Sequence, residues 1–191
     1  MSKRSTAIAA VFLDRDGVIN EEVEYLSDSS KLRLVPGSAR AIRLLNERAI
    51  PVIVVTNQSG VARGYYPESR IAHLHHALDE SLKDEGAHID RFYYCPHHPE
   101  GLGKYRIDCE CRKPKPGLLH EAAKDFSLNL KNCIIIGDKA SDIGAGIAAG
   151  CRTILVMTGY GKKELASWNQ PFQPGHVAED LQGSVEWLLR D

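Results

Sequence analysis

Two aspartates near the start of the chain have residue types and spacing suited to catalysis. Asp14 and Asp16, in the segment Asp14-Arg15-Asp16-Gly17, directly follow the apolar run 8–13. A short apolar run that ends at a turn signal predicts a buried strand, and open α/β sheets bind ligands beyond the carboxyl ends of their strands. Two carboxylates this close repel each other unless a cation lies between them, and Mg²⁺ prefers such oxygen ligands. One carboxylate could then attack phosphorus while the other transfers protons, although the same residues alone could simply form a turn.

Polar residues also follow two further apolar runs. They are Thr56, Asn57, Gln58, Ser59 and Gly60 after the run 50–55, and Gly137, Asp138, Lys139 and Asp142 after the run 132–136. Neighbouring parallel strands would bring these ends together as an acidic metal site beside hydroxyl, amide and lysine donors, which phosphoryl transfer requires. Taken singly, Thr56 could be a turn or cap residue, Asp138 a turn residue, and Asp142 the N-cap of the next helix.

A basic segment at 112–117 forms a fourth group. Arg112, Lys113 and Lys115 are interleaved with prolines that keep the chain extended before a predicted helix. Three positive charges near a helix N-terminus suit a phosphate group. The alternative is a solvated basic loop.

A loop at about 95–111 contains three cysteines and a histidine. The candidate ligands are Cys95, His97, Cys109 and Cys111. Three thiolates and one imidazole suit a closed tetrahedral Zn²⁺ site, which predicts a structural zinc. His98 is an alternative ligand, and a Cys109–Cys111 disulfide is a strained alternative to a metal. Cys133 and Cys151 lie in apolar surroundings and are predicted to belong to the core.

Length and composition limit the class of protein. The 191 residues are 43% hydrophobic and 26% charged, and the formal net charge is -1. These values predict a single domain over 1–191 and give no support for a nucleic-acid or membrane surface. No apolar stretch approaches the ~20 residues needed to span a bilayer, and none resembles a signal peptide. We therefore expect a cytoplasmic protein.

Alternating apolar runs and helical patterns predict an α/β protein. The expected strands are 8–13, 50–55, 89–94, 132–136 and 152–157, and the expected helices are 36–48, 67–85, 116–126, 142–149 and 181–190. Residues 20–34 are expected to form a loop at the mouth of the site. Strands that alternate with helices imply a parallel sheet with right-handed crossovers.

The motifs together resemble the haloacid dehalogenase superfamily of phosphatases. They are D-R-D-G at 14–17, T-N-Q-S-G at 56–60, C-R-K-P-K-P-G at 111–117 and G-D-K-x-x-D at 137–142. The cysteine pattern is similar to the branch that contains histidinol phosphatases and heptose bisphosphate phosphatases. The resemblance extends from about residue 8 to 160. It implies a three-layer Rossmann-like parallel sheet without a large cap domain.

The resemblance also implies roles for individual residues. Asp14 would be the nucleophile that forms an aspartyl-phosphate, and Asp16 the general acid and then the base. Asp14, the backbone carbonyl of Asp16 and Asp138 would hold Mg²⁺, while Thr56 and Lys113 would hold the phosphoryl group. The implied substrate-binding residues are Arg15, Glu22, Val23, Glu24, Tyr25, Asn57, Gln58, Ser59, Arg112 and Lys139.

The activity implied by the resemblance is Mg²⁺-dependent hydrolysis of the C7 phosphate of a heptose bisphosphate, in the synthesis of nucleotide-activated heptose for lipopolysaccharide. Histidinol phosphate is the alternative substrate. The segment Glu22-Val23-Glu24-Tyr25 is more acidic than the family pattern, and its carboxylates would bind sugar hydroxyls while repelling a second phosphate. We expect a monomer that acts on a small sugar phosphate. A polynucleotide phosphatase is disfavoured because the chain has no aromatic and basic strip.

Overall fold

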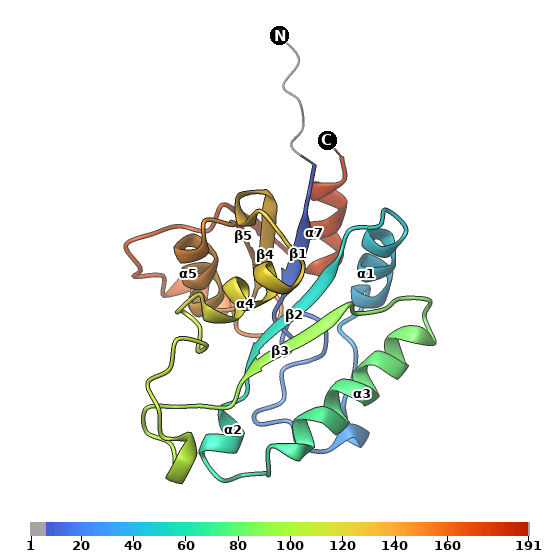
Figure 1. Cartoon of the computed structure of the whole chain (residues 1–191). Helices are drawn as coiled ribbons and strands as arrows, with labels where there is room; N and C mark the ends of the chain where they lie inside the picture. Colours follow the sequence, from blue (N-terminus) through green and yellow to red (C-terminus); the bar gives the residue numbers. More distant parts are fainter. Residues whose placement is uncertain (1–6, 191) are drawn as a thin grey trace.

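A parallel sheet of six strands forms the middle of the molecule (Figure 1). The computed structural model describes residues 7–190. The strand order is β3-β2-β1-β4-β5-β6, and every neighbouring pair is parallel. The strands are β1 Ala10–Leu13, β2 Val52–Asn57, β3 Arg91–Cys95, β4 Cys133–Gly137, β5 Arg152–Val156 and β6 His176–Ala178. This arrangement confirms the predicted α/β fold class.

The helices follow the strands in alternation. They are α1 Ser38–Asn46, α2 Ser59–Ala62, α3 Ser69–Lys83, α4 Gly117–Asp125, α5 Ala140–Ala149, α6 Gly161–Ala166 and α7 Leu181–Leu188, with 3₁₀ turns at η1 Ser29–Lys31, η2 Gly103–Tyr105 and η3 Leu130–Asn132. The five predicted helices are confirmed with shifted ends. The short elements α2, α6 and β6 were missed, because each is too short to show a clear hydrophobic period.

Helices cover both faces of the sheet and make three layers (Figure 1). In β1, Val11 and Leu13 pack with α1, α3 and α7, while Ala10 and Phe12 pack with α4 and α5. Both faces of the strand are therefore buried from solvent, which explains why its sequence is a continuous apolar run and not an alternating one.

The register of the sheet brings the polar strand ends together. Leu13 is opposite Val54 of β2 on one side and Ile136 of β4 on the other. The residues after these three positions consequently emerge at one edge of the sheet. This edge is the carboxyl end of the strands, where the sequence predicts the site.

Two long connections border this edge. The connection from β1 to α1 and the connection from β3 to α4 each contain only a 3₁₀ turn as helical structure. Within residues 7–190 neither connection folds into a large cap, as the resemblance implied. The described residues contain no helix with the length and apolarity required to cross a membrane.

Candidate active site

Lys113 lies buried at the centre of the site. Its Nζ atom is 3.0 Å from Asp14 Oδ1 and 2.6 Å from Asp142 Oδ1, and it donates a hydrogen bond to the Val55 carbonyl at 2.7 Å. Burial opposes the charge of this ammonium group, but the two carboxylates outweigh burial and raise the pKa of Lys113. Lys113 is therefore a fixed positive charge next to the predicted nucleophile.

Three carboxylates lie close together, and two of them contact this lysine. Asp14, Asp138 and Asp142 each place one oxygen within 4.8 Å of the others. Burial, followed by the neighbouring Asp14 charge, raises the pKa of Asp138 to about 8. Asp138 Oδ1 is buried and has no hydrogen-bond partner among residues 7–190. An excess of buried carboxylate with an unpaired oxygen fits a hard divalent cation such as Mg²⁺.

A glycine turn closes tightly over Asp138. The Tyr160 N–H donates to Asp138 Oδ2 at 2.8 Å. Gly17 has a φ of 81°, and a Cβ at this position would collide with Asp138 Oδ2. Gly17 is therefore required both for its left-handed backbone and for the close approach of Asp138.

Asp16 has a different environment from Asp14. Its carboxylate accepts hydrogen bonds from Arg15 at 2.7 Å, Asn20 at 3.0 Å and Gln58 at 3.1 Å. Burial raises its pKa, but the Arg15 charge and these hydrogen bonds exceed that effect, so the net pKa of Asp16 is lowered. The Asp16 side chain is not part of the carboxylate cluster, and its backbone carbonyl remains the predicted metal ligand.

Residues at the carboxyl end of β2 hold the basic segment in place. Asn57 bonds the backbone of Lys113 twice, with its Nδ2 donating to the carbonyl at 3.0 Å and its Oδ1 accepting from the N–H at 3.1 Å. The buried Thr56 hydroxyl accepts a hydrogen bond from Gln58 Nε2 at 3.0 Å. Asn57 therefore fixes the position of the Lys113 backbone, in addition to its predicted contact with substrate.

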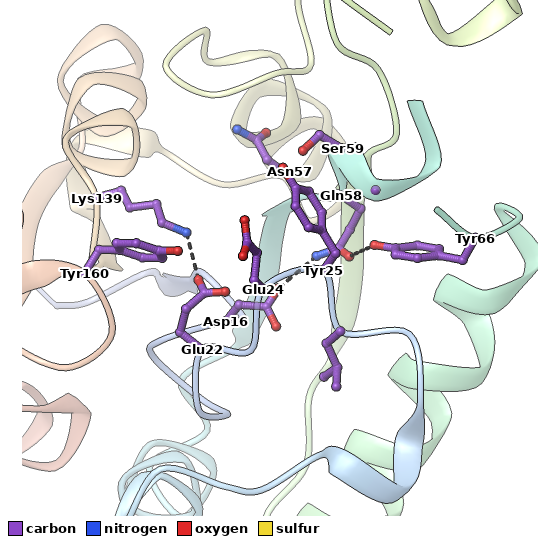
Figure 2. A pocket seen from close by; sticks show the side chains of 12 residues that line it. Asp16, Glu22, Glu24, Tyr25, Asn57, Gln58, Ser59, Tyr66, Lys139 and Tyr160 are labelled. Atoms are coloured by element: carbon purple, nitrogen blue, oxygen red, sulfur yellow. Dashed lines mark hydrogen bonds and ion pairs between the residues drawn. The ribbon is translucent and has the colours of Figure 1, made fainter. Parts of the chain in front are cut away.

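A polar pocket of about 210 Å³ opens beside this cluster (Figure 2). Its lining residues are Asp16, Glu22, Glu24, Tyr25, Leu26, Asn57, Gln58, Ser59, Gly60, Tyr66, Lys139 and Tyr160. Seven of the ten predicted substrate-binding residues lie in this lining. Sequence reasoning missed Leu26, Gly60, Tyr66 and Tyr160, of which Gly60 lies within the quoted segment 56–60 and Leu26 directly follows the segment 22–25.

Three predicted substrate-binding residues do not line this pocket. Arg15 is buried and bonds Asp16, Val23 packs partly buried against the core, and Arg112 donates to the His97 carbonyl at 3.3 Å. Arg15 is placed to orient Asp16 and not to face the pocket.

An ion pair crosses the pocket mouth. Lys139 Nζ is 2.9 Å from Glu22 Oε2 and lies 4.5 Å from the centre of the Tyr160 ring (Figure 2). Burial raises the pKa of Glu22 and the Lys139 charge opposes this effect. Lys139 thus presents a positive charge to the pocket, and the Glu22 carboxylate already neutralises part of this charge.

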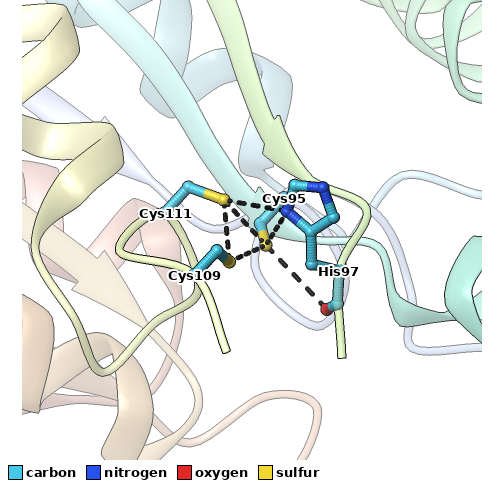
Figure 3. A group of neighbouring side chains, drawn as sticks. All are labelled: Cys95, His97, Cys109 and Cys111. Atoms are coloured by element: carbon cyan, nitrogen blue, oxygen red, sulfur yellow. Dashed lines mark hydrogen bonds between the residues drawn. The ribbon is translucent and has the colours of Figure 1, made fainter. Parts of the chain in front are cut away.

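The loop at 95–111 brings its four predicted ligands together (Figure 3). Cys111 Sγ is 3.0 Å from Cys109 Sγ, 3.1 Å from Cys95 Sγ and 3.5 Å from His97 Nδ1. The cysteines are free thiols, so the alternative Cys109–Cys111 disulfide is wrong. His98 is not part of the group and accepts from the Glu100 N–H at 3.1 Å. This donor set fits a tetrahedral metal site.

Comparisons with known proteins show strong similarity to phosphatases. Residues 110–184 match a family model described as HAD-hydrolase-like. A D-glycero-D-manno-heptose-1,7-bisphosphate 7-phosphatase of Thermosynechococcus vestitus is 44% identical over 185 residues, which is 94% of each chain. The corresponding phosphatase of Pasteurella multocida is 43% identical over 151 residues, 78% of this chain and 82% of that protein.

A solved structure is also similar. The D,D-heptose 1.7-bisphosphate phosphatase from B. bronchiseptica, complexed with magnesium and phosphate, has a TM-score of 0.86 at 34% identity and covers 95% of this chain and 98% of that chain. The fold is thus that of a haloacid dehalogenase-like hydrolase. The identity over nearly the whole chain goes further: the chain belongs to the family of D-glycero-D-manno-heptose-1,7-bisphosphate 7-phosphatases. This confirms the resemblance stated from the motifs.

Proposed function

We propose that the chain is a phosphoric monoester hydrolase that removes the C7 phosphate of D-glycero-D-manno-heptose 1,7-bisphosphate. The observation that carries this proposal is the buried Asp14–Lys113 pair beside an acidic cluster and a polar pocket, in a chain 44% identical to a phosphatase of that name. The product would enter nucleotide-activated heptose synthesis for lipopolysaccharide.

We propose that Asp14 is the nucleophile. Its carboxylate lies at the floor of the site and would attack phosphorus to form an aspartyl-phosphate, while Asp16 would protonate the leaving oxygen and then activate water. Lys113 and Thr56 would hold the phosphoryl oxygens. Lys113 is suited to this because it is a buried cation 3.0 Å from Asp14 Oδ1.

The proposed metals follow from the donor sets. Asp14, Asp138 and the Asp16 carbonyl would hold Mg²⁺, which when bound neutralises charge on the transferring phosphoryl group. The unpaired Asp138 Oδ1 supports this assignment. Cys95, His97, Cys109 and Cys111 would hold a structural Zn²⁺, because all four positions are supplied by the protein.

Four charged residues have proposed roles in substrate recognition. Arg112 and Lys139 would contact the rest of the substrate, with Glu22 and Glu24 facing its hydroxyls.

We propose that residues 1–191 act as one phosphatase domain, because the described strands join a single sheet. The free thiols support a reducing compartment, and we propose a cytoplasmic monomer.

A substrate panel tests the proposal. Steady-state kinetics with Mg²⁺ should give the highest kcat/KM for heptose 1,7-bisphosphate, with release of the C7 phosphate identified by phosphorus NMR. Histidinol phosphate and fructose 1,6-bisphosphate are the competing substrates. A preference for histidinol phosphate would contradict the substrate assignment while leaving the phosphatase chemistry intact.

A further inference from the structure

Tyr25 has a strained backbone conformation at the edge of the polar pocket. It is one of the residues that line this pocket, and its φ of 54° places a large side chain in the left-handed region. This conformation is costly for a residue that has a Cβ atom, and it persists only where the surrounding contacts hold it. The contacts that hold Tyr25 therefore also fix the shape of this side of the pocket.

The chain next to Tyr25 is anchored by one ion pair and one turn. Glu22 Oε2 is 2.9 Å from Lys139 Nζ, and the Leu26 N–H donates to the Val23 carbonyl at 3.0 Å. Neither contact involves the side chain of Tyr25. The position of the Tyr25 ring therefore depends on the groups that pack against it.

Tyr65 packs against this ring from the neighbouring loop. The centres of the two rings are 4.6 Å apart and their planes are inclined by 71°, which is an edge-to-face contact. Tyr25 also packs against the apolar cluster of Val61, Tyr66 and Ile71. Aromatic pairs of this geometry are favourable beyond the area that they bury, so Tyr65 stabilises the strained conformation of Tyr25.

The position of Tyr65 is fixed by the turn that ends α2. Its N–H donates to the Gly60 carbonyl at 2.9 Å, and Gly64 before it has a φ of 76°. Tyr65 is 60% exposed and lines a separate apolar cleft of about 610 Å³, whereas Tyr66 lines both this cleft and the polar pocket. Tyr25, Tyr65 and Tyr66 thus form a wall between the two cavities.

We propose that Tyr65 is a positioning residue for substrate specificity: its ring holds Tyr25 in the left-handed conformation and so fixes the wall of the pocket that faces the sugar. This inference rests on the proposed function, because it assigns the pocket to the part of the substrate beyond the transferred phosphate. Tyr65 lies outside both the carboxylate cluster and the polar pocket. We therefore expect it to affect binding of the sugar and not phosphoryl transfer.

Two substitutions separate the ring of Tyr65 from its hydroxyl. With the full chain and Mg²⁺, Tyr65→Ala should raise KM for heptose 1,7-bisphosphate roughly three- to tenfold, the range that one aromatic pair contributes, with kcat within about twofold. Tyr65→Phe keeps the ring and should retain the wild-type KM. Acetyl phosphate is too small to reach the sugar side of the pocket, so its kcat and KM should stay unchanged in both variants.

The matched control is Leu102→Ala. Leu102 is 63% exposed and lines the same apolar cleft as Tyr65, so this variant removes a comparable surface group from the other side of the cleft. It should leave KM for the heptose substrate unchanged. A wild-type KM in Tyr65→Ala would overturn the proposal, and so would an equal loss with acetyl phosphate, which would indicate general damage to the enzyme.

A double substitution tests whether Tyr65 acts through Tyr25. Glycine adopts a left-handed backbone without the cost that a side chain imposes, and Tyr25→Gly leaves no ring for Tyr65 to hold. Tyr65→Ala should therefore raise KM in the wild-type background and leave it unchanged in the Tyr25→Gly background. Equal effects in the two backgrounds would overturn the proposal.

A further measurement does not depend on activity. In the NMR spectrum of the wild-type protein, ring protons of Tyr25 and Tyr65 should show a nuclear Overhauser contact, because the ring centres are only 4.6 Å apart. The backbone amides of residues 22–25 should gain ps–ns mobility in Tyr65→Ala but not in Tyr65→Phe. Absence of the contact, or unchanged mobility in Tyr65→Ala, would overturn the proposal. If the wild type did not hydrolyse heptose 1,7-bisphosphate, the proposed function would fail while these spectra still decided the contact.

Discussion

The carboxylate site and the cysteine loop both collect metal-binding side chains, but they are built in different ways. Asp14 is distant in sequence from Asp138 and Asp142, and it meets them because β1 and β4 are neighbours in a buried sheet. The four ligands at 95–111 come from the last residue of β3 and from the connection that joins β3 to α4. The first cluster is positioned by the core, whereas the second depends on its own ligands to order the loop.

The two regions share one short segment. Cys111 belongs to the cysteine cluster, and Lys113, two residues later, contacts Asp14. Asn57 of β2 bonds the Lys113 backbone at 3.0 and 3.1 Å and provides a second tether. We therefore expect changes at the carboxylates to affect chemistry and changes at the cysteines to affect stability first.

The largest expected effect is that of Asp14→Asn. Removing the nucleophilic carboxylate should lower kcat roughly 10⁴-fold or more, the range seen when a catalytic nucleophile is lost. The far-UV spectrum and the zinc content should stay at wild-type values, because neither the core nor the cysteine loop loses a contact. Asp108→Asn, at an exposed carboxylate of the loop, is the control. Residual activity near the wild-type rate would exclude Asp14 as the nucleophile.

The next effect is that of Cys109→Ser, which addresses the other side of the comparison. Loss of one thiolate should remove the bound zinc and lower the free energy of unfolding by roughly 3 kcal/mol, similar to the loss of a crosslink. The measurements are metal analysis and urea unfolding. Cys151→Ala, at a core cysteine outside the cluster, should retain zinc. Full zinc content in Cys109→Ser would show that the ligand set is wrong.

The last prediction is a pH dependence of stability in the metal-free protein. The pKa of Asp138 is raised from 3.8 to about 8 in the folded chain, so the folded state binds this proton more tightly than the unfolded state. The stabilisation is complete below about pH 4 and is lost as pH rises toward 8. Thermal unfolding across this range measures it.

Magnesium and one variant sharpen this prediction. Since Mg²⁺ competes with the proton for the carboxylates, its stabilising effect should grow with pH over the same range. Asp138→Asn should flatten the pH dependence and weaken the response to Mg²⁺. An unchanged slope in that variant would assign the effect to another group.

The main elements of the fold could be predicted because their signals are local. The runs before Asp14, Thr56 and Asp138 are apolar throughout, and such runs are typical of strands with both faces covered. β6 gave no such signal. It is three residues long, lies at the edge of the sheet and is only partly buried, so its pairing with β5 supplies what its sequence lacks.

The sequence predicts which residues belong to the site better than it predicts which groups those residues contact. Asp14 and Asp16 differ by two positions, yet one lies among carboxylates and the other is bonded by Arg15, Asn20 and Gln58. Arg15 is predicted to bind substrate, and in the structure it is buried and bonds Asp16. Spacing along the chain cannot show which of two adjacent charges turns inward, because that choice depends on groups far away in sequence.

The parallel α/β class, the edge at which the polar residues gather and the two donor sets could be predicted from the sequence, because strand periodicity and ligand type are local properties. The charge state and the partner of each group depend on the folded structure. Lys113 remains charged when buried because Asp14, which follows β1, and Asp142, in the first turn of α5, both lie within 3.0 Å of its Nζ atom. Coulomb energies depend on such distances and on burial, and neither is set until the sheet has formed.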